Sequence, residues 1–170
     1  MTKLAPVSAT QDHIQGPINA GIVLIEYGDF ECPYCGEAYP ELKAVKAAMK
    51  DDLCFVFRHF PLREMHPHAE RAAEFAEAAA TIGKFWEMHD TLYENQQALT
   101  DRDLTAYAKS LGLDAKLIQS ALSGQFTSRV QHDFSTGVRS GVNGTPCLFL
   151  NSERYDGPRD ATSLIELMRG

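Results

Sequence analysis

Hydrophobic residues follow two different spacings along the chain. Short, continuous runs rich in β-branched and aromatic residues predict buried strands. These runs lie at 22–25, 53–57 and 147–150, with a shorter partner strand at 154–155. Between the first two runs, Leu42, Val45 and Met49 recur at helical spacing, and Asp51-Asp52 closes the predicted helix. The first part of the chain therefore predicts a strand–helix–strand unit with a right-handed parallel crossover.

Helical patterns follow one another from residue 66 to about residue 141. An alanine-rich stretch at 69–82 predicts a helix with a small-residue surface for close packing. Cap residues, glycine breaks and periodicity predict further helices at 85–95, 100–110, 114–123, 126–140 and, after the late strands, 162–169. Val130, Phe134 and Val138 recur at i, i+4 and i+8 and are expected to share a face. Residues 1–20 predict a loose lead-in.

Composition narrows the classes of function. The chain has 170 residues and a formal net charge of −7. It has no cluster of Lys and Arg that could bind nucleic acid or an anionic membrane. The longest apolar run, 21–25, is far too short to span a membrane. Residues 1–20 lack the apolar region of a secretory signal, which favours a cytoplasmic protein; the alternative is a periplasmic or secreted protein after removal of a signal peptide.

The four cysteines are too few for a disulfide scaffold in a chain of this length. Two of them form the sequence Cys32-Pro33-Tyr34-Cys35, where the predicted strand gives way to the helix. The helix dipole favours a thiolate at Cys32 by roughly 2 kcal/mol at most, so a larger lowering of its pKa requires hydrogen bonds to sulfur. Cys35, one turn later, is expected to be more buried. An exposed attacking thiolate and a protected resolving thiol are what thiol–disulfide exchange requires.

Three residues near the pair bear on this interpretation. Glu26 lies in an otherwise apolar strand. If buried, its carboxylate would have a raised pKa and could accept the Cys35 proton; the alternative is a strand-end carboxylate in water. Pro40 lies inside the predicted helix and is expected to kink it. Cys54, amid apolar residues, is expected to be an inert core thiol.

Four stretches of the chain together resemble DsbA-like proteins of the thioredoxin fold. They read IEYGDFECPYC, FRHFPL, HPHAERAAEFAEAAATIGKFWEMHDTLYENQ and GVNGTPCLFLN. The resemblance runs from about Asp12 to the C-terminus, and the most similar subgroup includes stand-alone bacterial oxidoreductases and domains fused to sodium/proton antiporters. It implies an α/β thioredoxin fold with an all-helical domain inserted after the second core strand. The expected boundaries are 12–64 and 141–170 for the thioredoxin fold, 65–140 for the helical insertion and 1–11 for a lead-in.

The resemblance also implies roles for single residues. It makes Thr145-Pro146 a cis peptide bond that faces the dithiol, where the residues alone would favour an ordinary trans proline. The Thr145 backbone could then pair with an extended substrate chain, beside the surface of Pro33 and Tyr34. Glu26 matches the buried acid of the family, which favours its role as proton acceptor.

Two residues depart from the family pattern. Tyr34 stands where DsbA oxidants carry a histidine, and it cannot supply the positive charge that stabilises a thiolate. We therefore expect a milder, glutaredoxin-like potential. Cys147 follows Pro146 directly, where relatives usually carry Thr or another small residue. It is either a buried small hydrophobe or a third thiol that could form alternative or mixed disulfides.

Histidines raise the alternative of a metal site beside the cysteine pair. The candidates are His59, His66, His68 and His89. A structural zinc site needs four ligands, usually in two close pairs, and the spacing of His66 and His68 makes a poor second pair. No metal is therefore predicted. His66 and His68 are expected to cap a helix in solvent, and Phe85 and Trp86 to pack in the helical core.

The predicted function is thiol–disulfide exchange on protein disulfides or dithiols. Cys32 attacks, Cys35 resolves the mixed disulfide, Glu26 manages the Cys35 proton and Thr145-Pro146 positions the partner chain. The expected partners are protein or small-molecule thiols and disulfides and a recycling redox partner, without nucleic acid, membrane, metal or organic cofactor. The alternatives are glutathione-linked, glutaredoxin-like or isomerase activity, and a metal-holding or partner-docking module without turnover.

Overall fold

The strands of the protein form a single sheet in the computed structural model, which describes residues 4–170. The strand order is β1-β3-β2-β4-β5. The bounds are β1 (His13–Gln15), β2 (Ile22–Gly28), β3 (Leu53–His59), β4 (Cys147–Leu150) and β5 (Glu153–Tyr155). β2 and β3 pair in parallel, whereas β1, β4 and β5 each pair antiparallel with their neighbours. Helix α1 (Pro33–Met49) and a 3₁₀ turn (Lys50–Asp52) connect β2 to β3.

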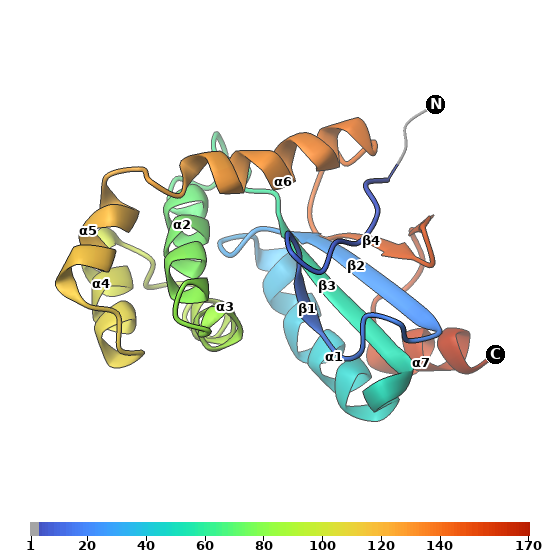
Figure 1. The fold of residues 1–170 in the computed structure, drawn as a ribbon. Helices are drawn as coiled ribbons and strands as arrows, with labels where there is room; N and C mark the ends of the chain where they lie inside the picture. Colours follow the sequence, from blue (N-terminus) through green and yellow to red (C-terminus); the bar gives the residue numbers. More distant parts are fainter. Residues whose placement is uncertain (1–3) are drawn as a thin grey trace.

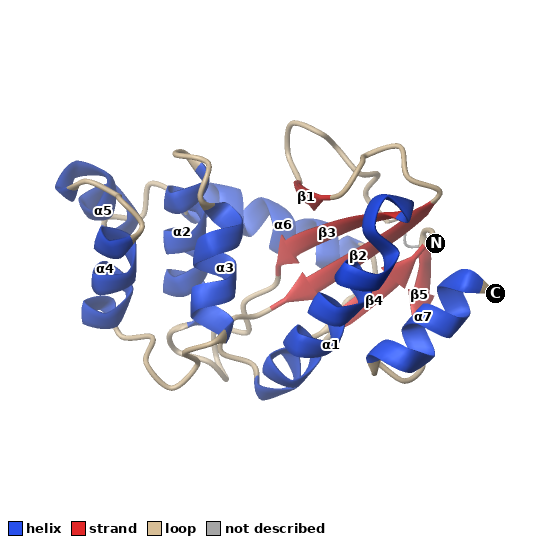
Figure 2. Ribbon diagram, turned by 90° about the horizontal axis from the view of Figure 1, so that it is seen from below, coloured by secondary structure: helices blue, strands red, loops and turns tan. Residues whose placement is uncertain are grey.

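Five helices lie between β3 and β4 in the chain. They are α2 (Ala69–Ala80), α3 (Phe85–Tyr93), α4 (Asp101–Ser110), α5 (Ala115–Leu122) and α6 (Thr127–Arg139). α2 to α5 gather beside the sheet, and α6 returns across it (Figure 1). The last helix, α7 (Ala161–Arg169), lies next to α1 on one face of the sheet, while α6 lies on the other (Figures 1 and 2). The predicted thioredoxin fold with inserted helices is confirmed.

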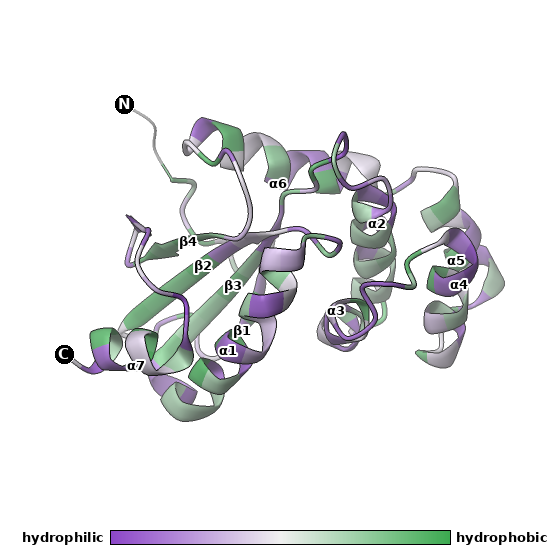
Figure 3. Cartoon of the chain, turned by 180° about the vertical axis from the view of Figure 1, so that it is seen from behind, coloured by the Kyte–Doolittle hydropathy of each residue, from purple (hydrophilic) through white to green (hydrophobic). Residues whose placement is uncertain are grey.

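The hydrophobic core is divided by the sheet into two clusters, and alternation along the strands decides which residue enters which cluster. On β2, Leu24 joins the larger cluster under α1, whereas Ile25 and Tyr27 join the smaller one on the opposite face. Most of β2 and β3 is coloured as hydrophobic (Figure 3). Cys54 is fully buried in the smaller cluster, as expected of a core thiol.

The structure corrects three expectations about local structure. The loose lead-in contains a strand, because β1 pairs antiparallel with the edge of β3; residues 1–3 of the lead-in lie outside the described residues. Val138 is 52% exposed, so the expected apolar face of α6 ends at Phe134, which stacks on Phe60. Phe85 packs against Phe57 of the sheet, so it joins the helices to the sheet instead of filling a separate helical core.

A side-chain cap begins α4 at the residue that the sequence predicts. Thr100 and Asp103 form a reciprocal capping box at the start of α4. α1 continues through Pro40.

None of the helices in residues 4–170 has both the length and the apolar character needed to cross a membrane.

A buried ion pair attaches the N-terminal segment to the sheet. Arg58 on β3 donates from Nε to Asp12 at 2.8 Å and from Nη1 to the Tyr27 hydroxyl at 3.0 Å. The Arg58 and Asp12 side chains are 3% and 5% exposed. A buried charge without its partner is strongly destabilising. The segment before β2 is therefore an integral part of the fold.

We expect Asp12→Ala to lower the free energy of unfolding by about 3–5 kcal/mol, because it leaves the Arg58 guanidinium buried and unpaired. Urea denaturation measures the loss. The matched control is Asp156→Ala, which breaks an exposed pair with Arg154 and should cost less than about 1 kcal/mol. Equal losses in the two variants would contradict the structural role of the N-terminal segment.

Candidate active site

The two cysteines of the pair lie at the start of α1, directly after the carboxyl end of β2. Cys32 is the N-cap of α1, Pro33 occupies the first turn, and Cys35 lies one turn further in. The two cysteines come within 3.7 Å of each other. Cys32 is only 3% exposed, which corrects the expectation of an exposed thiol. The Thr145 segment covers it, and the Cys32 thiol lies 3.5 Å from the Thr145 carbonyl oxygen.

The surroundings of the two thiols shift their pKa values in opposite directions. The Cys35 side chain hydrogen-bonds to the Cys32 sulfur and, against the effect of burial, lowers the Cys32 pKa to about 5. Backbone groups of Tyr34 and Cys35 contribute to the same lowering. Burial, the bond to Cys32 and the nearby charge of Glu26 raise the Cys35 pKa well above its ordinary value. At neutral pH the pair therefore holds a thiolate at Cys32 and a protonated thiol at Cys35.

Glu26 lies on β2 beneath this pair. The register places Glu26 between Phe57 of β3 and Leu148 of β4, and Glu26 is 2% exposed. Burial raises its pKa to about 7, although the positive charge of Lys46 acts in the opposite direction. Of the two alternatives raised by the sequence, the structure therefore contains the buried acid. A carboxyl group with this pKa can both hold and release a proton near neutral pH.

The Thr145-Pro146 bond is cis, as the resemblance implies. Tyr34, 61% exposed, lies on the outer side of the pair and lines a shallow groove. The other lining residues come from α1 and from the loop before α7: Glu37, Ala38, Glu41 and Gly157 to Asp160.

Cys147 is not part of the dithiol site. It packs in the smaller cluster with Tyr27 and Phe149, whereas Cys32 and Cys35 belong to the larger cluster. The next residue of β4, Leu148, faces the dithiol side. The structure thus places Cys147 on the far face of the sheet, and burial raises its pKa.

Asp29 is a residue of the site that the sequence analysis missed. It is 1% exposed and lies between the end of β2 and the pair. Its Oδ1 accepts the backbone N–H groups of Glu31 at 2.7 Å and Cys32 at 3.1 Å. Its Oδ2 accepts the N–H of Leu62 and Nδ1–H of His66, both at 2.8 Å. One carboxylate thus joins the first turn of α1 to the loop that leads into the inserted helices.

Two further contacts reach the site from the inserted segment. His68 is the N-cap residue of α2, as expected, although its side chain makes no capping hydrogen bond; its backbone N–H donates to Glu31 at 2.8 Å. His66, expected in a solvated cap, instead bonds to Asp29 and supports the active-site loop. Gln96, in the loop after α3, donates to the carbonyl oxygens of Phe30 and Cys32, both at 2.9 Å. A side chain at Gly36 would collide with this glutamine, so the glycine after Cys35 makes room for the contact.

Comparison with known proteins identifies the family. A family model described as thioredoxin matches residues 8–168, almost the whole chain. The chain belongs to the thioredoxin family. Its curated relatives include Na(+)/H(+) antiporter NhaA 1 of Mycolicibacterium vanbaalenii, 42% identical over 97% of this chain, and NhaA 3 of Salinispora tropica, 42% identical over 95%. The chain spans only 27% and 25% of the length of these two relatives.

Solved structures give the same fold. BdbD from Bacillus subtilis superposes with a TM-score of 0.86 at 20% identity, covering 99% of this chain and 96% of that one. A thioredoxin-like oxidoreductase from Silicibacter pomeroyi gives 0.81 at 22% identity, with 94% and 91% covered. The thiol-disulfide exchange protein alpha-DsbA2 from Wolbachia pipientis gives 0.79 at 17% identity, with 95% and 87% covered. The predicted resemblance to DsbA-like proteins, in the subgroup related to antiporter-fused domains, is confirmed.

We expect Asp29→Asn to lower the free energy of unfolding by about 2–3 kcal/mol, because the amide replaces one of the two charged acceptor oxygens with a donor. Chemical denaturation of the reduced protein measures the effect. Glu31→Gln is the matched control, since it keeps the oxygen that accepts from His68, and it should change stability by less than about 0.5 kcal/mol. If Asp29→Asn were equally mild, the four contacts of Asp29 would not hold the loop.

Proposed function

We infer that this chain is a thiol–disulfide oxidoreductase in which Cys32 is the nucleophile and Cys35 the resolving thiol. The observation that carries the proposal is the contrast between two adjacent thiols: the pKa of Cys32 is lowered to about 5, and that of Cys35 is raised. A thiolate is the attacking species in disulfide exchange, and a resolving thiol has to wait as a protonated group until the mixed disulfide forms.

In the reducing direction, the Cys32 thiolate attacks one sulfur of a substrate disulfide. The substrate S–S bond breaks, a bond forms between Cys32 and the substrate, and the substrate's other sulfur leaves as a thiolate that takes a proton from water. The groove beside Tyr34 and the Thr145 backbone support the partner chain at this stage. Neither a metal nor an organic cofactor takes part in this step.

In the second step Cys35 gives its proton to the Glu26 carboxylate and attacks the Cys32 sulfur. The mixed disulfide breaks, the second substrate thiolate leaves, and Cys32 and Cys35 become joined by a disulfide. The substrate has gained two electrons and the protein has lost two. Oxidation of a substrate dithiol is the same sequence in reverse. Protein or small-molecule thiols and disulfides are the proposed substrates, and a second redox partner restores the starting state.

The direction depends on the compartment and on the reduction potential of the pair. A reducing cytoplasm favours the dithiol form and therefore reductase or isomerase work, whereas an oxidising compartment favours oxidation of substrates. Equilibration of the pair with glutathione redox buffers measures the potential. Rapid reduction of the oxidised form by glutathione alone would favour the glutathione-linked alternative over exchange with a protein partner.

We expect Cys35→Ser to accumulate a mixed disulfide on Cys32, because the second step cannot occur. Incubation with a disulfide-bonded test peptide, followed by mass spectrometry without reductant, detects the adduct. The matched variant is Cys32→Ser with Cys35 intact, which should trap little because its remaining thiol is buried and protonated. Equal trapping by the two variants would contradict the assigned roles, and no trapping by either would contradict the proposed function.

We expect Glu26→Gln to slow the second step without abolishing it. In the wild-type protein the rate should rise as pH passes through about 7, where Glu26 ionises, and this rise should be lost in the variant. Stopped-flow measurements between about pH 6 and pH 8, around that pKa, follow the decay of the mixed disulfide. Identical pH profiles for the two proteins would remove Glu26 from the mechanism.

The same variant has a stability readout that is independent of turnover. Burial raises the Glu26 pKa from 4.5 to about 7, so between these values the folded protein keeps a proton that the unfolded chain releases. The stabilisation of the folded state that protonated Glu26 contributes is fully present below about pH 4.5, and it is lost as the pH rises towards 7. Glu26→Gln should not show this decline in urea denaturation of the reduced protein. A decline of unchanged size would mean that Glu26 is not the buried titrating acid.

A further inference from the structure

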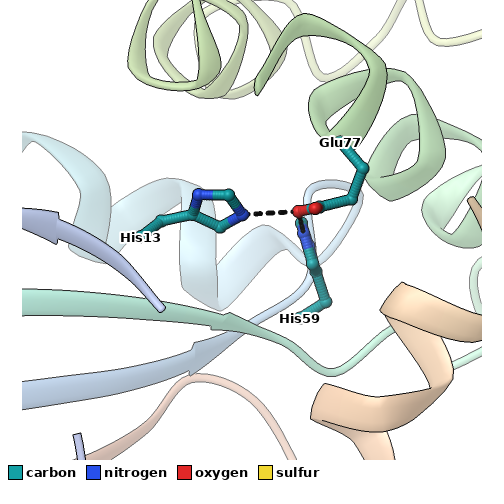
Figure 4. Close-up of side chains that lie close together, drawn as sticks. All are labelled: His13, His59 and Glu77. Atoms are coloured by element: carbon teal, nitrogen blue, oxygen red, sulfur yellow. Dashed lines mark hydrogen bonds and ion pairs between the residues drawn. The ribbon is translucent and has the colours of Figure 1, made fainter. Parts of the chain in front are cut away.

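A second cluster of chemically active side chains lies apart from the dithiol and has no part in the proposed exchange. His13 from β1, His59 from the end of β3 and Glu77 from α2 point toward one another (Figure 4). The Nε2 atoms of His13 and His59 lie 2.6 Å and 2.7 Å from the same Glu77 oxygen, Oε2. Three elements far apart in the sequence thus present two imidazoles and a carboxylate at one point.

The three side chains lie near enough to one another to share one metal ion. The ligand atoms all lie within 4.8 Å of one another. Two ligands of a tetrahedral zinc ion with bonds of about 2.0–2.1 Å are roughly 3.3 Å apart, so Glu77 would move back slightly from its hydrogen-bonding distances of 2.6 Å and 2.7 Å when an ion enters. In the hydrogen-bonded form, each imidazole needs its hydrogen on Nε2 to donate to the carboxylate. With an ion between them, each would carry its hydrogen on Nδ1 and offer the Nε2 lone pair.

Aromatic rings hold both imidazoles in place. The His13 ring is stacked on Phe85 at 3.5 Å and 5°. The His59 ring meets Phe57 edge-on at 5.5 Å and Phe85 at 5.9 Å. His59 Nδ1 is buried and has no hydrogen-bond partner in residues 4–170, so these rings and the Glu77 contact set its orientation. Ligands that are already oriented lose little freedom when they bind an ion.

The charges around the cluster favour a cation. Arg129 reaches Glu77 Oε1 at 3.5 Å, but it also donates to Asp133 at 2.7 Å. Asp12, next to His13 in the chain, is paired with Arg58. The three carboxylates of Asp12, Glu77 and Asp133 and the two guanidinium groups of Arg58 and Arg129 carry a combined formal charge of −1. Burial opposes ionisation of Glu77, yet its hydrogen bonds to the two histidines hold its pKa below the ordinary value.

The cluster is also open to solvent on one side. An open hollow on the surface is lined by His13, Glu77, Phe85 and Arg129, together with residues of the segment before β1. The His13 side chain is 14% exposed, whereas His59 is 1% exposed. An ion could therefore enter from the His13 side, and water could complete its coordination there.

We propose that His13, His59 and Glu77 form a binding site for a divalent transition-metal ion, with Zn²⁺ as the first candidate. Two imidazoles and one carboxylate are a donor set that suits zinc and other first-row ions, and they leave a position open for water. The ion would join β1, β3 and α2, and so would fasten the lead-in strand and the first inserted helix to the core sheet. Its role is to stabilise the fold, because an ion that binds only the folded chain shifts unfolding toward higher temperature.

The experiment uses the full chain with Cys32→Ser and Cys35→Ser, so that the dithiol cannot bind the ion. Zn²⁺ is added to metal-stripped protein, and binding is followed by calorimetry and by the melting temperature. We expect one ion per chain and a melting temperature that rises with Zn²⁺ concentration. Co²⁺ should give visible absorption of a nitrogen- and oxygen-bound ion without a thiolate charge-transfer band. Because this background lacks the dithiol, the outcome is independent of the proposed redox function.

His13→Ala is the decisive variant, since His13 is partly exposed at the edge of the sheet and its loss leaves the buried His59 in place. It should weaken Zn²⁺ binding at least about tenfold. Replacing even a residue that only hydrogen-bonds to a metal ligand lowers metal affinity by about that factor, and His13 is proposed as a ligand itself. His132→Ala, at an exposed histidine of α6, is the matched control and should bind like the parent. Unchanged binding in His13→Ala, or no binding by the parent, would overturn the site. A melting temperature raised by Ca²⁺ but not by Zn²⁺ would overturn the assignment of histidine ligands.

Discussion

The burial of one carboxylate, that of Asp29, is the constraint on which the active site depends. A buried carboxylate has to accept hydrogen bonds on both oxygens, since a bare buried charge is too costly. Its donors come from both sides: Glu31 and Cys32 on the turn into α1, and Leu62 and His66 on the segment after β3. The position of the nucleophile is therefore tied to the start of the helical insertion, and neither part can take its final form without the other.

Much of the fold could be predicted because its signals are local. Runs of apolar residues marked β2, β3 and β4, and cap residues such as Thr100 marked helix starts. Glu26 could be singled out because a charge in an apolar strand is unusual. β1 could not, because its three residues are held by pairing with β3 and by the pair between Asp12 and Arg58. Such support comes from residues distant in the chain, and no short window of sequence contains it.

The same limit explains which contacts around the site could not be predicted. An aspartate after a strand is common in turns, so nothing near Asp29 indicates that Leu62 and His66 complete its bonds. The sequence alone offers the histidines only as candidate metal ligands beside the cysteines, whereas in the structure His59 and His66 contact acidic residues, Glu77 and Asp29. Sequence identifies residues capable of chemistry; which of them meet depends on how the inserted helices fold back onto the sheet.

The alternation of side chains along β4 limits how the chain can be oxidised. Four cysteines could pair in several ways, but Cys147 and Cys54 are held on one side of the sheet, with Cys32 and Cys35 on the other. While the sheet is intact, no exchange can pass a disulfide from one side to the other. On the proposed function, the folded chain therefore exchanges electrons through Cys32 and Cys35 alone, and the backbone of the sheet separates this pair from Cys54 and Cys147.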